Sequence, residues 1–186
     1  MLAVDYLLNE YKPTGALERA DLERFRQFVA EYGKKIYDRT PGQPTILASA
    51  FVVNPDFTKA LLIHHRAHGQ IKQFGGHADG KRNLAAVSAR ELKQESGARG
   101  TLLYPLPIDI IRWNVPFRNK DGIDYPEHDG FDILFLFMMS ESTKLKPNKR
   151  EAEGVLTEWM GLKIWRDKPL DPKNPTDIAN PQNWDY

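Results

Sequence analysis

The 186-residue sequence contains no cysteine. A chain without thiols has no disulfide, no thiolate zinc site and no cysteine nucleophile, and it suits a reducing compartment. An excess of either charge is also absent, because 26 Lys and Arg against 25 Asp and Glu leave a net charge of +1. No global field therefore directs the chain to nucleic acid or membrane, although a small phosphate-bearing ligand needs only local charge.

Long apolar runs are missing as well. No stretch approaches the roughly 18 residues of a membrane-spanning helix. The first residues, MLAVDYLLNEYK, have no basic region and carry Asp5 within the apolar stretch, so a secretory signal peptide is not expected. We expect a cytoplasmic protein with no membrane partner.

The N-terminal part of the chain has the pattern of an amphipathic helix. Between residues 17 and 37, apolar side chains recur at steps of three and four, as expected for one helix face: Leu22, Phe25, Phe28, Val29, Tyr32 and Ile36. We favour a packing helix that covers either a sheet or a partner, such as a second copy in a homodimer. Prolines and a glycine at 41–44 mark a linker, so residues 1–44 are predicted to be a helical extension packed on the core.

The middle of the chain alternates in character between strands and one helix. Residues 83–96 are rich in Ala, Leu, Glu and Lys, and Gly97 follows as a C-terminal stop. β-Rich segments lie on both sides of this helix, with a turn at 54–57: 45–53, 59–65, 107–113, 131–139 and 157–162. This order predicts an α/β fold in which a mixed sheet packs against helices. Proline-rich residues 164–186 are predicted to form an irregular tail.

Two glutamates on the predicted helix draw attention. Glu91 and Glu95 are four residues apart, so they share a helix face and repel each other. On a helical wheel they lie beside the boundary of the apolar face, where a shared cation explains them better than solvation does. Gly75 and Gly76 precede the helix and allow close backbone approach to an ion. A solvated helix with incidental glutamates is the alternative.

The order of these parts resembles the Nudix box of the Nudix hydrolases. In residues 75–98, GGHADGKRNLAAVSARELKQESGA, Gly76 opens the box. Arg90-Glu91-Leu92 matches its REU segment, Glu95 the second Glu of its EE pair, and Gly97 its closing Gly. The flanking segments 64–80 and 154–162 resemble a branch of the family with a GGHxDG loop. The resemblance implies a Nudix-type α/β/α sandwich, a mixed sheet between helices, over residues 45–163.

The sequence departs from the box at three positions, and the last of them, Ala98 at the terminal aliphatic position, is conservative. Arg82 occupies a position where the family has Glu, and Gln94 replaces the first Glu of the EE pair. An isomerase on the same fold relies on a cysteine that this chain lacks. The departures leave two interpretations, a metal-dependent hydrolase or a catalytically weakened Nudix-fold nucleotide-binding module.

The resemblance also implies a set of site residues. The metal, Mg²⁺ or Mn²⁺, would be held by the carbonyl of Gly75 and by Glu91, Glu95 and Glu153, with Glu91 or Glu153 as the general base. Glu153 is equally well explained as part of a polar turn. Arg90 and Gln94 would act on the metal ligands and not on the metal itself. Arg90 would orient Glu91 through a charge-assisted hydrogen bond.

The implied substrate is a small nucleotide, a nucleoside diphosphate derivative hydrolysed at its diphosphate linkage. Gly76, His77 and His128 are the candidate substrate contacts. For each histidine a purely structural role is the competing interpretation, and we favour it.

Overall fold

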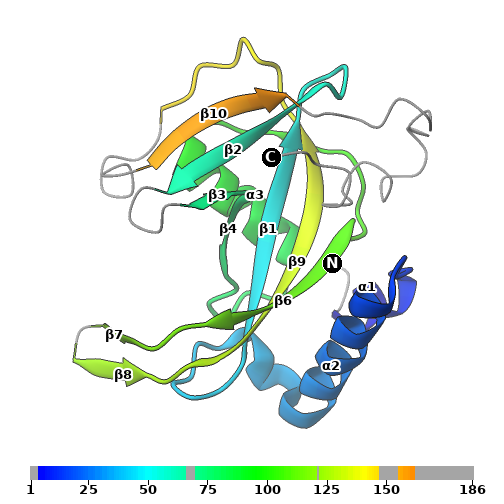
Figure 1. Ribbon diagram of the computed structural model, residues 1–186, viewed down its shortest axis with the longest axis vertical. Coiled ribbons are helices and arrows are strands. Elements are labelled where there is room, and N and C mark those ends of the chain that lie inside the picture. The colour runs from blue at the N-terminus through cyan, green and yellow to red at the C-terminus, as the bar shows by residue number, and fades with distance from the viewer. Residues whose placement is uncertain (1–3, 66–69, 121, 147–154, 162–186) are drawn as a thin grey trace.

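The computed structural model describes residues 4–65, 70–120, 122–146 and 155–161 (Figure 1). Within these ranges the main sheet has eight strands, with β10, β2, β1, β9 and β5 side by side, β3 paired with β2, β4 with β1, and β6 with β9. The strands of this sheet are β1 Thr45–Val53, β2 Lys59–His65, β3 Gln70–Lys72, β4 Phe74–His77, β5 Thr101–Leu102, β6 Asp109–Val115, β9 His128–Met138 and β10 Val155–Gly161. A separate hairpin consists of β7 Arg118–Lys120 and β8 Ile123–Tyr125.

The sheet is mixed because its two central strands run parallel and their neighbours do not. β1 pairs in parallel with β9, from Thr45 beside Gly130 to Val53 beside Met138. β2 and β4 pair antiparallel with β1, and β6 antiparallel with β9. All nine residues of β1 are buried, which accounts for its nearly continuous apolar sequence.

The N-terminal helices cover part of this sheet. α2, Ala16–Tyr32, follows the short α1, Val4–Glu10, and leads into a 3₁₀ turn, Gly33–Tyr37. The ring centroids of Phe25 and Phe28 lie 4.8 and 4.9 Å from that of Phe131 on β9. α2 therefore packs on the sheet of its own chain. A homodimer stays a prediction.

The third helix, α3, spans Leu84–Ser96 and packs against β1 and β4. Asn83 caps its first turn by accepting a hydrogen bond from the backbone N–H of Ala86 at 3.1 Å. Gly97 ends it at φ 72°, a left-handed conformation that glycine adopts without strain. Both ends agree with the helix predicted from the sequence.

The predicted α/β class, a mixed sheet with helices packed on it and consistent with an α/β/α sandwich, is confirmed. The helices just described pack on the sheet face formed by Ile46, Ala48 and their neighbours on β9. The sequence patterns did not predict α1 or the β7–β8 hairpin. The predicted tail lies outside the described residues, and the proposed boundaries at 44 and 163 stay predictions. No described helix is long and apolar enough to cross a lipid bilayer.

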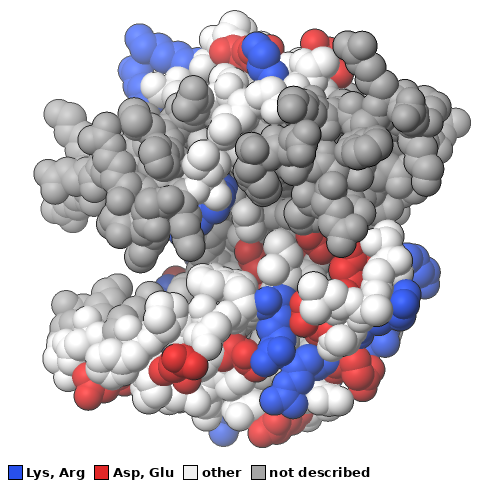
Figure 2. All heavy atoms as spheres, in the orientation of Figure 1, with Lys and Arg blue, Asp and Glu red and all other residues white. Residues whose placement is uncertain are grey.

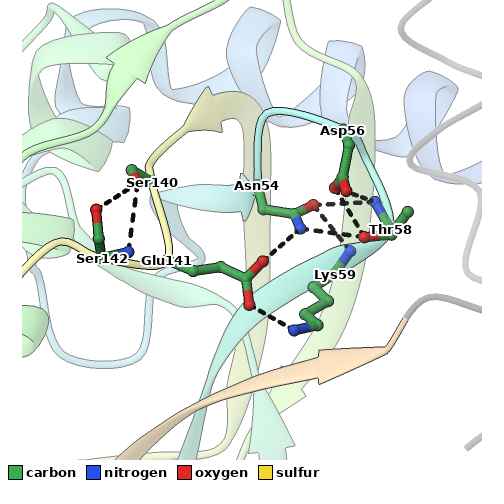
Figure 3. Close-up of polar contacts among 7 residues, drawn as sticks. All are labelled: Asn54, Asp56, Thr58, Lys59, Ser140, Glu141 and Ser142. Atoms are coloured by element: carbon green, nitrogen blue, oxygen red, sulfur yellow. Dashed lines mark hydrogen bonds and ion pairs between the residues drawn. The ribbon is translucent and has the colours of Figure 1, made fainter.

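The predicted turn after β1 is tied to the loop after β9 (Figure 3). The amide group of Asn54 donates to Glu141 Oε1 at 3.0 Å, and its carbonyl accepts from the backbone N–H groups of Thr58 and Lys59, each at 2.9 Å. Lys59 Nζ also contacts Glu141 at 2.5 Å. These contacts tie the turn between β1 and β2 to the loop that follows β9.

Candidate active site

The two glutamates of α3 lie in the face of the helix that packs on the sheet. The fully buried residues of α3 surround them on the helical wheel: Leu84, Val87, Ser88, Leu92 and Ser96. The sequence pattern placed Glu91 and Glu95 beside the core boundary, whereas the structure places them within the packing face, half-buried. The Glu91 carboxylate fits there because β4 presents Gly76 instead of a larger side chain.

Glu91 lies directly against Gly76. A Cβ atom at position 76 would lie 2.7 Å from Glu91 Cδ and 2.8 Å from its Oε2. Only glycine at position 76 therefore leaves room for the carboxylate of Glu91.

Glu95 contacts the neighbouring glycine. The backbone N–H of Gly75 donates to Glu95 Oε2 at 3.1 Å. In an antiparallel strand the N–H and C=O of one residue point to the same side. The Gly75 carbonyl is thus on the side of the strand that faces Glu95.

Arg90 connects the helix to the end of β4. Its guanidinium donates to Glu91 Oε1 through Nε at 3.0 Å and through Nη2 at 2.5 Å. Nη2 also donates to the backbone carbonyl of His77 at 2.9 Å. This side chain fixes the orientation of Glu91 relative to the strand, the geometry that the sequence-based hypothesis requires.

The two polar departures from the Nudix box lie at the surface. Gln94 is exposed on α3, and Arg82 is exposed just before the helix. Glu153 lies outside the described residues. Within the described part of the chain, no group of three or more His, Asp or Glu side chains is placed to hold a metal ion, so the acidic donors there are Glu91 and Glu95.

The two histidines lie on a different face of the sheet from the glutamates. Gly76 pairs with Ala48 and His77 with Leu47 on β1, so the two residues point to opposite faces. His128 lies on β9 and is buried, and its Nδ1 is 2.7 Å from the carbonyl oxygen of Pro126. The structure thus brings Gly75, Gly76, Arg90, Glu91 and Glu95 together, and leaves both histidine side chains on the far side of the sheet.

A buried pair behind the glycines was not among the predicted site residues. Ser49 Oγ donates to Asp132 Oδ2 at 2.6 Å, and burial raises the pKa of Asp132 to about 6. A Cβ at Gly75 would lie 2.0 Å from Ser49 Oγ, so the pair packs directly on the strand that carries the site. The two residues are 83 positions apart in sequence. For Asp132 the sequence signals were its place within the apolar run 131–139 and its position four residues after His128.

The donor set suits a hard cation. Mg²⁺ accepts one or two protein carboxylates, keeps several waters and bridges to substrate phosphates. Glu91, Glu95 and the backbone oxygen of Gly75 are oxygen donors of that kind, and both glutamates lie against the glycines of β4. The residues present therefore fit such an ion.

No protein-family model matches the chain, and no curated protein matches it. Among solved structures, it is similar to a hydrolase of the NUDIX family from Clostridium perfringens, at 20% identity over 62% of this chain and 80% of that one, with a TM-score of 0.44. It is also similar to the E. coli dihydroneopterin triphosphate pyrophosphohydrolase, at 12% identity over 77% and 95% of the two chains, with a TM-score of 0.47. A NUDIX hydrolase from Nitrosomonas europaea gives 17% identity over 64% and 73%, with a TM-score of 0.42. Likeness at this level does not assign a function.

Proposed function

We propose that this protein is a metal-dependent hydrolase of the Nudix type that cleaves the diphosphate linkage of a nucleoside diphosphate derivative. One observation carries the proposal: the carboxylates of Glu91 and Glu95 converge on Gly75 and Gly76. Gly76, Glu91 and Glu95 stand in the order and spacing of the Nudix box, and Gly75 directly precedes it. A solvated helix with incidental glutamates would not be expected to direct both carboxylates toward the two glycines of β4.

Glu91, Glu95 and the carbonyl of Gly75 would hold the ion, Mg²⁺ or Mn²⁺, and Glu153 would complete the set. When bound, such an ion supplies neutralisation of the diphosphate charge and acidification of a coordinated water. Because the described part of the chain offers two acidic ligands, we expect modest affinity for the free ion.

Residues of the protein itself orient the metal ligands and accept the proton of the attacking water. Arg90 holds Glu91 in one orientation through the two hydrogen bonds to Oε1. Either Glu91 or Glu153 accepts a proton as water oxygen attacks phosphorus. The P–O bond of the anhydride breaks, and the leaving phosphate carries away the electron pair. Gly76 contributes by its lack of a side chain, which leaves space for Glu91 and for the diphosphate.

The test is a substrate screen with purified protein. Nucleoside diphosphate sugars, dinucleotides, nucleoside triphosphates and capped RNA are each incubated with Mg²⁺, with Mn²⁺ and with EDTA, and phosphate-containing products are quantified. We expect metal-dependent cleavage of at least one diphosphate linkage. No cleavage of any compound at any metal concentration would contradict the proposal.

A second candidate function is a nucleotide-binding module with weakened catalysis. The exposed Gln94 and Arg82, at positions where the family carries Glu, favour it. The two functions separate in a comparison of wild type with Gln94→Glu. If wild type binds nucleotides but cleaves none, and the Gln94→Glu variant cleaves them, the binding module is the correct assignment. If wild type already cleaves a nucleotide, the hydrolase is the correct assignment.

A further inference from the structure

A cavity lies at the end of the molecule where α1 and α2 are side by side (Figure 1). Its walls come from these two helices, from the 3₁₀ turn and from the loop before α3. The cavity volume is about 500 Å³, within the roughly 300–1,000 Å³ of small-molecule sites in proteins. It shares no residue with the proposed hydrolytic centre, so a ligand bound there would be a different one.

The floor of the cavity is apolar. Val4 and Leu8 of α1 and Ile36 of the 3₁₀ turn line it and are 4%, 1% and 1% exposed. Val29 of α2 is half-buried beside them. Because apolar surface gains free energy when it leaves water, this floor favours a ligand with an apolar group.

The rim of the cavity is cationic. Arg26, Lys34 and Arg82 line it against one carboxylate, Asp5, and all four residues are exposed. This excess of two positive charges is local, because the whole chain has a net charge of +1. In contrast, Figure 2 shows Lys and Arg interspersed with Asp and Glu on the side of the molecule where α2 lies. The cavity therefore complements a molecule with negative charge at one end and an apolar group at the other.

Contacts within the fold hold two of these cations at the rim. Arg26 Nη2 donates to the backbone carbonyl of Leu8 at 3.1 Å, and the guanidinium has further N–H groups that can donate to a ligand. The loop that carries Arg82 is attached to the 3₁₀ turn, because the backbone N–H of Gly80 donates to the carbonyl of Tyr37 at 2.7 Å. The N-terminal extension and the loop before α3 thus form the cavity together.

Arg82 is explained by this cavity and not by the hydrolytic centre. It occupies a position of the Nudix box where the family has Glu. A Glu at this position would leave two basic and two acidic side chains around the cavity and would remove its charge excess. Anion binding therefore accounts for a departure from the box that the proposed hydrolysis leaves without a role.

The charge excess indicates the head group of the ligand. A phosphate monoester carries about −1.5 to −2 charges at pH 7 and presents three acceptor oxygens, whereas a carboxylate would neutralise only half of the excess. We propose that the cavity binds a phosphate monoester joined to an apolar group, with the phosphate beside Lys34 and Arg82 and the apolar group on the floor. Soluble alkyl phosphates and phosphatidate in a membrane share this chemistry. The proposal goes beyond the proposed function and does not depend on it.

The test is isothermal titration calorimetry of the full chain in EDTA, so that metal binding and hydrolysis do not enter. The probe is octyl phosphate below its micelle concentration. Octan-1-ol, which lacks the phosphate, and inorganic phosphate, which lacks the apolar group, are the reference compounds. We expect octyl phosphate to bind at least about tenfold more tightly than either.

Lys34→Glu and Arg82→Glu each reverse one charge at the rim and should weaken octyl phosphate binding about tenfold. Lys35→Glu and Lys81→Glu are the matched controls, because each makes the same charge change one residue away, on an exposed side chain that does not line the cavity. In about 0.15 M salt, which screens charges beyond roughly 8 Å, the controls should weaken binding less than about twofold.

Ala30→Leu tests the interior of the cavity with every charge unchanged. Ala30 lines the cavity from α2, and Leu is also a good helix former, so the added atoms should fill part of the cavity without a lower melting temperature. This variant should also weaken octyl phosphate binding. Wild-type affinity of all three lining variants would overturn the proposal, as would equal weakening by the lining and control substitutions, or octan-1-ol that binds as tightly as octyl phosphate.

Co-sedimentation with phosphatidylcholine vesicles that contain phosphatidate distinguishes the two sources of the ligand. Sedimentation that Lys34→Glu and Arg82→Glu reduce would support the cavity with a lipid as its ligand. Octyl phosphate binding without sedimentation would support it with a soluble compound. If octyl phosphate does not bind and neither substitution affects sedimentation, the proposal is wrong.

Discussion

The Cα of Gly76 lies so close to the carboxylate of Glu91 that a Cβ at this position would be 2.7 Å from Glu91 Cδ. Glu91 is also held on its other side by Arg90, with two hydrogen bonds to Oε1. The carboxylate is thus confined between a strand backbone and a guanidinium, and its position depends on both.

Gly76→Ala should displace this carboxylate. The obstacle is the flexible end of a side chain, so the fold should survive with a loss of about 1 kcal/mol or less, while Glu91 leaves its place beside Arg90. We expect Mg²⁺-dependent turnover to fall at least about tenfold, as expected when a catalytic group is misplaced. Initial rates over a Mg²⁺ titration, with thermal melts in parallel, measure both effects.

Gly15→Ala is the control for this substitution. Gly15 precedes α2 with φ −125°, and a Cβ there meets no atom within 4 Å. Its rates should match those of wild type, and its melting temperature should fall only slightly, because Gly15 caps α2 and alanine is a weaker N-cap. A Gly76→Ala protein with full activity would show that the contact with Glu91 has no functional role.

Arg90→Lys should preserve the positive charge but lose the planar arrangement of hydrogen-bond donors. An ammonium group does not reproduce the fork that donates to both Glu91 and the His77 carbonyl. We expect about a tenfold loss in metal affinity, the lower range for groups that orient metal ligands, with a small change in stability. The half-saturating Mg²⁺ concentration of the reaction reports it. If that concentration is unchanged and only the melting temperature falls, Arg90 has a purely structural role.

Asp109 should make the protein less stable as pH rises. Burial raises its pKa from 3.8 to about 6, while it accepts a hydrogen bond from the backbone N–H of Ile110 at 2.7 Å. The folded state therefore binds this proton more tightly than the unfolded state. Its destabilising effect is absent below about pH 4, grows between pH 4 and 6, and is complete above that range.

Asp109→Asn removes this titration and retains the acceptor oxygen. The variant's free energy of unfolding minus that of wild type should be larger at pH 7 than at pH 4 by about 1–3 kcal/mol. Urea unfolding at both pH values gives the difference. The same difference at both would show that Asp109 titrates normally in the folded protein.

Local patterns in the sequence predicted much of this fold. The segments 45–53 and 59–65 form β1 and β2 with those bounds, and Asn83 and Gly97 enclose α3 as its composition indicated. The strand predicted at 107–113 begins two residues later, at Asp109. Propensity and periodicity act over a few residues, so they locate such elements well.

Local patterns in the sequence did not predict the contacts between segments that are distant in sequence. The predicted helix over 17–37 ends at Tyr32, because Gly33 adopts φ 53° and a 3₁₀ turn follows. His77 looked like a neighbour of Gly76 in the site, but strand alternation sends its side chain to the other face. The partnership of Ser49 with Asp132 depends on which strands pair, and a single sequence contains no direct signal of that pairing.

The central claim, that Glu91 and Glu95 form a metal-dependent hydrolytic centre, is tested most directly by Glu95→Gln. This variant has nearly the same shape, and its amide oxygen can still accept from the Gly75 N–H, but it lacks the charge that a cation requires. The measurement is the initial rate of diphosphate cleavage as Mg²⁺ is increased, for wild type and variant on the substrate found in the screen. The account predicts saturable Mg²⁺ dependence in wild type and at least about a hundredfold lower rate in the variant, equivalent to roughly 2.7 kcal/mol of transition-state stabilisation. Equal rates and equal Mg²⁺ dependence in the two proteins would contradict it.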